Sequence, residues 1–211
     1  MYLPVPIRTP RWIIRYYSHY LWGVRSSQAV YLTFDDGPTT DVTTEILQLL
    51  NTYRAKATFF CVGHNVDQHP QIFKKIINQG HSWGNHTYHH EDFKTNNLVD
   101  YYKSIEKCRI SMERYSLQTT KLFRPPQGRI NKTYTSLLED AYQVVFWTLL
   151  SMDHQHINVD LCVRNLKKVQ QGDIVVLHDN TRTKDVTLQS LEIFLKWAND
   201  KNIPLLGLPM Q

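Results

Sequence analysis

The chain has 211 residues, of which 42% are hydrophobic and 20% are charged, as in an ordinary soluble domain. This length is sufficient for one domain with a sizeable core. No run of about 18 apolar residues occurs, which excludes a membrane-spanning helix. The formal net charge is +5, but a basic run, a zinc finger and an RNA-binding signature are all missing, so nucleic acid is not an expected partner.

The first 29 residues are predicted to form a basic and aromatic arm ahead of a catalytic domain over residues 30–211. Between Arg8 and Val24, three arginines alternate with tryptophan, tyrosine and aliphatic residues. An apolar h-region is lacking, so the arm is a poor signal peptide, and a cytoplasmic location is expected. The arm could lie on a membrane surface. Packing of its aromatic residues against the main domain is the favoured interpretation.

The three cysteines are Cys61, Cys108 and Cys162, an odd number without close spacing. Neither a disulfide framework nor a cysteine zinc site is therefore expected. We interpret them as small buried or partly buried thiols.

From Val30 onward, short β-rich runs alternate with helix-like stretches. In chain order, the expected elements are a strand over 30–34, a helix over 43–53, a strand over 57–62, a helix over 71–78, a strand over 81–85, a helix over 97–115, a strand over 122–123, a helix over 133–140, a strand over 143–148, a helix over 159–169, a strand over 174–177, a helix over 187–198 and a strand over 203–206. This alternation predicts an α/β fold, a distorted (β/α) barrel of about seven parallel strands resembling a TIM barrel. A doubly wound open sheet is the alternative.

Chemically versatile side chains follow the predicted strands. Two carboxylates follow the first strand, two histidines the third, an arginine the fourth, a carboxylate the fifth and a histidine the sixth. Because the carboxyl ends of parallel strands form the active-site face of such folds, one rim should gather all of these residues.

A metal site is predicted from two of these groups. Asp35 and Asp36 are adjacent carboxylates, which would repel each other in a dry pocket unless a cation neutralised one of them. His86 and His90 are four residues apart, a spacing that brings two imidazoles to one side of a helical turn. With Asp36 they would leave coordination positions open for water, as a catalytic zinc-type site requires. We interpret the neighbouring His89 as a bystander.

An acid–base function is predicted from the later strand ends. Arg124 begins a stiff Pro-Pro loop and is expected to pair with a carboxylate on the same rim. His178 ends an apolar strand. If Asp153 accepts a hydrogen bond from His178, that histidine becomes a suitable proton donor.

These blocks, taken in order, resemble the NodB-homology polysaccharide deacetylases of carbohydrate esterase family four. The resemblance covers about residues 30–208 and is carried by Thr33-Phe34-Asp35-Asp36-Gly37, His86-Thr87-Tyr88-His89-His90, Arg124-Pro125-Pro126-Gln127-Gly128, Asp153 and Val176-Leu177-His178.

The resemblance implies a role for each matching residue. Asp36, His86 and His90 would hold one divalent metal, with zinc expected and cobalt or nickel as alternatives. The implied catalytic residues are Asp35 as general base, His178 as general acid, Arg124 as the partner of Asp35 and Asp153 as the residue that orients His178. Thr87 would stabilise its loop. Contacts with the substrate or its oxyanion are expected at Gln127, Pro126, His154, Val176 and Leu177.

Four positions depart from the family pattern. Gln127 stands where many members carry Tyr or Phe, and Leu150 and His154 stand where many carry Asp and Trp. Val176 replaces a common Leu at the acetyl pocket. The metal and acid–base residues therefore transfer intact, whereas the substrate contacts do not transfer safely.

The function implied is removal of N-acetyl groups from N-acetylglucosamine-containing saccharides, with release of acetate, by a monomeric enzyme. Two alternatives stay open. One is a catalytically silent carbohydrate-binding module of the same fold, and the other is a hydrolase of small cyclic amides or O-acetyl esters.

Overall fold

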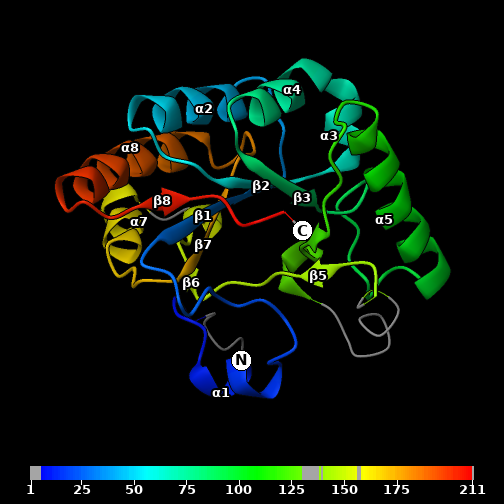
Figure 1. Cartoon of the computed structure of the whole chain (residues 1–211), viewed down its shortest axis with the longest axis horizontal. Helices are drawn as coiled ribbons and strands as arrows, with labels where there is room; N and C mark the ends of the chain where they lie inside the picture. The colour runs from blue at the N-terminus through cyan, green and yellow to red at the C-terminus, as the bar shows by residue number, and fades with distance from the viewer. Residues whose placement is uncertain (1–5, 130–137, 139, 156–157, 211) are drawn as a thin grey trace.

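A curled sheet of eight strands forms the centre of the molecule (Figure 1). The computed structural model describes residues 6–129, 138, 140–155 and 158–210. The strands are β1 (Val30–Asp35), β2 (Thr58–Cys61), β3 (Ser82–Asn85), β4 (Leu122–Phe123), β5 (Gln143–Val144), β6 (Leu149–Leu150), β7 (Ile174–His178) and β8 (Leu205–Leu206). Seven of them follow the order β5-β4-β3-β2-β1-β7-β6, and β8 pairs with the start of β1. All pairings between these strands are parallel, which confirms the predicted distorted barrel.

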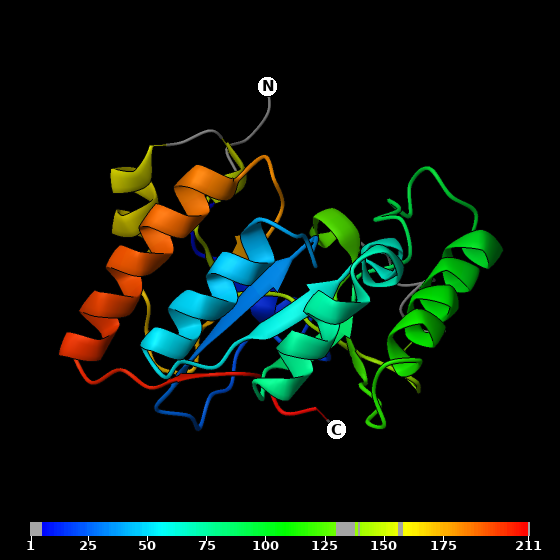
Figure 2. The ribbon, with the colours of Figure 1, turned by 90° about the horizontal axis from the view of Figure 1, so that it is seen from above.

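Helices cover the outer side of the sheet, as expected for right-handed crossovers between parallel strands. They are α2 (Val42–Thr52), α3 (Gly63–Gln68), α4 (Pro70–Asn78), α5 (Leu98–Glu113), α7 (Val159–Leu166) and α8 (Lys184–Asp200). Figure 2 shows α2 beside α8 on this side of the sheet, while α5 lies at the opposite end. None of the helices in the described part of the chain has the length and apolar character that a bilayer crossing requires.

The sequence explains these elements locally. Every residue of β1 is buried, so its run of apolar side chains packs on both faces of the sheet. In α2 the buried residues Ile46, Leu47 and Leu50 recur with helical spacing. Pro70 occupies the first turn of α4, where its missing N–H has no intrahelical partner to lose. The Asn97 side chain caps α5 by accepting a hydrogen bond from the Asp100 N–H.

The segment before β1 contacts both open edges of the sheet. It contains the short helix α1 (Arg11–Tyr16), which lies apart from the other helices in Figure 1. Before α1, the Leu150 N–H donates to the Ile7 carbonyl at the edge of β6. After α1, Leu21 pairs with Val145 beside β5. The aromatic ring of Trp22 stacks on Phe146 with centroids 4.6 Å apart.

Most predicted elements are confirmed within one to three residues, but two predictions need correction. The strand expected over 143–148 is only the two-residue strand β5, and a separate strand, β6, begins at Leu149 and forms the opposite edge of the sheet. The helix α3 was not anticipated, because Val66 is its only buried aliphatic residue. The helix expected over 133–140 falls mostly outside the described residues. The three cysteines are free and buried, as predicted.

Candidate active site

A cavity of about 500 Å³ opens at the carboxyl ends of β1, β3, β4 and β7. The predicted residues that line it are Asp35, Asp36, His86, His90, Gln127, Leu150, Asp153, His154, Val176 and His178. Arg124 is fully buried behind Asp35. Pro126 and Leu177 are buried and do not line the cavity, and Leu177 packs in the core beneath it.

Asp36, His86 and His90 converge at the cavity wall. Asp36 Oδ1 lies 3.7 Å from His86 Nε2 and 3.3 Å from His90 Nε2, and one ligand atom from each residue lies within 4.8 Å of the others. Among the described residues, this buried oxygen has no hydrogen-bond partner. An orphaned carboxylate oxygen facing two imidazole nitrogens is suited to a divalent cation, and one carboxylate with two histidines is a familiar zinc donor set.

The tautomer of His86 also suits a metal ligand. His86 Nδ1 lies 2.7 Å from the Arg124 carbonyl oxygen, which can only accept, so Nδ1 carries the proton and Nε2 is left with its lone pair. Burial lowers the pKa of His86 to about 4, despite the opposing charges of Asp35 and Asp36, and the ring is therefore neutral.

A loop, not a helical turn, brings the two histidines together. Residues 86–90 have no helical assignment, and Thr87 and His90 have φ angles of 64° and 60°. The Thr87 hydroxyl accepts a hydrogen bond from the Glu91 N–H, which ties the loop closed. The prediction of a shared helical face was therefore wrong in its geometry, although the two rings do meet at a centroid distance of 5.0 Å. His89 is exposed and lies beside His64 instead.

Asp35 and Arg124 form a buried ion pair. Arg124 Nη1 lies 2.7 Å from Asp35 Oδ1 and also donates to the Thr33 hydroxyl. The other guanidinium nitrogens donate to the carbonyls of Val145 and Phe146. All three guanidinium nitrogens are therefore engaged in hydrogen bonds, and the expected arginine–carboxylate pair is present.

Asp153 and His178 form a second pair across the cavity. The ring nitrogen Nδ1 of His178 lies 2.8 Å from Asp153 Oδ1, and the backbone N–H of His178 donates a hydrogen bond to Asp153 Oδ2. The hydroxyls of Ser151 and Thr187 each donate a further hydrogen bond to the Asp153 carboxylate. Burial would lower the pKa of His178, but the charge of Asp153 and its hydrogen bond raise it to about 9. His178 is therefore a protonated imidazolium at neutral pH, oriented by its carboxylate.

Two residues that follow His178 were not anticipated. The Asn180 side-chain amide donates to Asp36 Oδ2 at 2.6 Å, which leaves Oδ1 to face the histidines. Asp179 is buried and accepts hydrogen bonds from the Gly37 N–H and the Thr43 hydroxyl. Burial raises its pKa to about 7, and the nearby charge of Asp36 adds to the effect. The sequence does contain a signal for Asp179 and Asn180, because both are polar and directly follow a strand that ends in histidine.

Aromatic and basic side chains line the rest of the cavity. The His154 ring lies 4.9 Å from that of His178, and Trp147 supplies the aromatic wall. Gln127 has a φ angle of 58°, and a Cβ atom on the adjacent Gly128 would lie 2.2 Å from the Trp147 ring. Glycine is therefore required where this loop meets the tryptophan. Arg129 and Arg182 also line the cavity and make its outer part basic.

The curled parallel sheet, with a carboxylate–arginine pair and a carboxylate–histidine pair on its carboxyl rim, is the architecture of a (β/α)-barrel hydrolase. Comparison with known proteins narrows this class. A sequence profile described as polysaccharide deacetylase matches residues 23–145. The chain therefore belongs to the polysaccharide deacetylase family.

Individual relatives agree with this assignment. A peptidoglycan-N-acetylglucosamine deacetylase of Bacillus cereus is 33% identical over 182 residues, covering 81% of this chain and 82% of that protein. Peptidoglycan-N-acetylglucosamine deacetylase PgdA of Listeria monocytogenes is 27% identical over 92% of this chain, but the match spans only 40% of its own length. The crystal structure of a peptidoglycan N-acetylglucosamine deacetylase in complex with 4-naphthalen-1-yl-N-oxidanyl-benzamide superposes with a TM-score of 0.87 at 29% identity, covering 95% of each chain.

Proposed function

We propose that this protein is a metal-dependent deacetylase that removes N-acetyl groups from N-acetylglucosamine-containing poly- or oligosaccharides and releases acetate. The observation that carries the proposal is Asp36 Oδ1, a buried oxygen that has no hydrogen-bond partner in the described part of the chain and faces the Nε2 atoms of His86 and His90. The acid–base residues Asp35 and His178 line the same cavity.

Asp36, His86 and His90 would hold one divalent ion, and zinc is proposed because the donor set is one carboxylate and two imidazoles. When bound, such an ion supplies Lewis acidity toward the acetyl carbonyl and the attacking water. Cobalt and nickel accept the same donors, so supply decides which ion is used.

Asp35 is the proposed general base. It accepts the proton of the water that attacks the acetyl carbon, while Arg124 holds the carboxylate in place from behind. The negative charge that develops on the acetyl oxygen would be stabilised by the Gln127 N–H in the rim of the cavity.

His178 is the proposed general acid. Its Nδ1 is engaged by Asp153, so Nε2 is the nitrogen that can give a proton to the departing sugar amine. Breaking the C–N bond then yields acetate and a free amino sugar. Each proton transfer is expected to contribute ~10²–10⁴-fold to the rate.

The test is acetate release from N-acetylglucosamine oligomers and from peptidoglycan, before and after chelation, with zinc, cobalt or nickel added back. Release that is lost on chelation and restored by a metal supports the proposal. Binding of the saccharides without acetate release, at every metal tried, would instead indicate a silent binding module. Turnover of only O-acetyl esters or cyclic amides would indicate that the protein is a hydrolase with a different substrate.

A further inference from the structure

The short helix α1 has one face packed on the domain and one face in solvent. Ile13 and Ile14 are half-buried against a cluster that contains Tyr20, Trp22 and Phe146. At about 100° per residue, Trp12 and Tyr16 fall together on the opposite side of the helix. Their exposed fractions are 71% and 74%.

The same exposed side is cationic. Arg11 and Arg15 are both exposed and, being four residues apart, lie next to the row formed by Trp12 and Tyr16. We refer to Arg11, Trp12, Arg15 and Tyr16 as the α1 patch. Arg8 pairs with Asp173, whereas no ion pair to Arg11 or Arg15 exists within the described ranges. No acidic residue precedes Asp35 in the chain, and the carboxylate of Asp173, which lines the cavity beside Ile14, is paired with Arg8.

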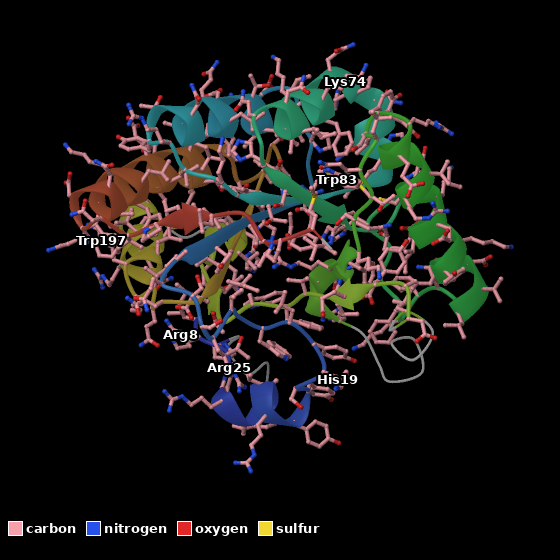
Figure 3. The ribbon with its side chains drawn as sticks, viewed as in Figure 1. Arg8, His19, Arg25, Lys74, Trp83 and Trp197 are labelled. Atoms are coloured by element: carbon pink, nitrogen blue, oxygen red, sulfur yellow. The ribbon has the colours of Figure 1, made fainter. Side chains whose placement is uncertain are left out.

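Arg25 adds one further exposed basic side chain near α1, whereas the charge of Arg8 is already paired with Asp173. Figure 3 shows Arg8, His19 and Arg25 around α1, with Lys74 at the far side of the molecule. Arg25 lines a cavity of about 410 Å³ between α1 and the domain, together with Ile14, Trp22 and Val24. Guanidinium groups and indole and phenol rings therefore project from one protruding element.

We propose that the α1 patch docks this domain on an anionic membrane surface. Tryptophan and tyrosine are the side chains that favour the boundary between head groups and acyl chains, and arginine is attracted to anionic lipid. A soluble anionic polymer would account for the arginines, but it offers no apolar layer for two rings that are about three-quarters exposed. The domain would then work with its cavity held close to the membrane.

The experiment is vesicle co-sedimentation of the full chain. One set of vesicles contains phosphatidylcholine with about one-third phosphatidylglycerol, and the other contains phosphatidylcholine alone. Arg11→Gln/Arg15→Gln removes the charge, and Trp12→Ala/Tyr16→Ala removes the rings. Lys74→Gln/Lys75→Gln is the matched control, because it removes two exposed charges from α4, far from α1.

We expect the wild-type protein and the lysine variant to bind anionic vesicles equally. The arginine variant should bind about 10- to 30-fold more weakly, and the aromatic variant at least about 10-fold more weakly. Circular dichroism and acetate release from a soluble oligomer should be unchanged in all variants. The docking proposal therefore fails or stands independently of the deacetylase proposal.

Three results would overturn it. The first is no binding of the wild-type protein to anionic vesicles, and the second is equal loss in the lysine control. The third is retention on immobilised polyglutamate together with vesicle binding that is unaffected by Trp12→Ala/Tyr16→Ala. That result would reassign the patch to a soluble polyanion.

Discussion

The Arg124 guanidinium lies 2.7 Å from Asp35 Oδ1, and the arginine side chain has no exposed surface. Arg124 thereby compensates one of two adjacent carboxylates at the cavity wall, since Asp36 is the next residue in the chain. Removing either partner of such a pair leaves the other as an uncompensated buried group. A change at Asp35 is therefore expected to affect both the proposed catalysis and the stability of the fold.

Replacement of Asp35 by asparagine should lower acetate release by ~10²–10⁴-fold, because the proposed base is lost. The free energy of unfolding should also fall, by about 3 kcal/mol, since Arg124 loses its counter-charge but keeps its three other acceptors. Acetate-release assays and urea unfolding on the same preparation check the two effects, and metal content shows whether the ligands are still in place. Full turnover in the asparagine variant would remove Asp35 from the mechanism.

His86→Ala should abolish metal binding and acetate release together, because it removes one of three convergent donors. His89→Ala provides a matched control, since His89 belongs to the same loop but lies outside the donor group. Metal content by mass spectrometry should remain at one ion per chain in the control. Stoichiometric metal in His86→Ala would contradict the assignment of the ligands.

Asn180→Ala should weaken metal binding by about 10- to 100-fold, a typical result when a residue that orients a ligand is removed. The amide of Asn180 occupies Asp36 Oδ2, so its loss lets the carboxylate rotate away from the histidines. Competition with a chelating dye measures the dissociation constant. Gln189→Ala, which removes an exposed amide from α8, should leave that constant unchanged.

The raised pKa of His178 predicts an alkaline limit on activity. The general acid must be protonated, so kcat/KM should fall as the pH rises through about 9. The stabilisation from this charged pair is fully present below about pH 6.5 and is lost as the pH rises through about 9. Asp153→Asn removes the charge that raises this pKa and should move the limit to lower pH. NMR titration of metal-free protein measures the pKa of His178 directly. The same His178 pKa in Asp153→Asn as in the wild-type protein would contradict the prediction.

Asp179→Asn should be tolerated, whereas Asp179→Ala should not. The pKa of Asp179 is raised to about 7, so stability falls as the pH rises from about 4 toward 7 and an uncharged amide avoids this loss. An amide oxygen can also keep the hydrogen bond from the Gly37 N–H. The alanine variant leaves that N–H and the donor O–H of Thr43 without an acceptor, at about 1–3 kcal/mol. Thermal unfolding of both variants at pH 8 makes the comparison.

The site was predictable because its residues follow apolar strands. Asp35, His178 and the residues near them end strands that are evident from composition alone, and parallel strands bring those ends to one rim. Asp179 and Asn180 were not predicted as site residues, because His178 at the end of the strand was already sufficient to assign a function to that segment. The contacts of Asn180 with Asp36 link positions 144 residues apart, which no local pattern contains.

The fold was predictable where apolar residues recur with strong helical periodicity, as in α4 and α7. It was not predictable at residues 143–150, where the apolar run looks like one strand. The chain instead leaves one edge of the sheet at Val144 and joins the other edge at Leu149. Only the pairing partners distinguish these outcomes, and β5 and β6 are each too short for a pattern of their own.

The contacts of residues 7–24 with β5 and β6 bear on how this domain should be handled. The family profile begins at residue 23, and a chain shortened to that residue at its N-terminal side alone would discard the bridging segments at Arg8 and Leu21 that cover the two edges. Uncovered edges present unpaired N–H and C=O groups that recruit other chains. The segment before β1 thus shields the sheet against self-association, and shortened versions of the protein are expected to aggregate even though every residue of the cavity is retained.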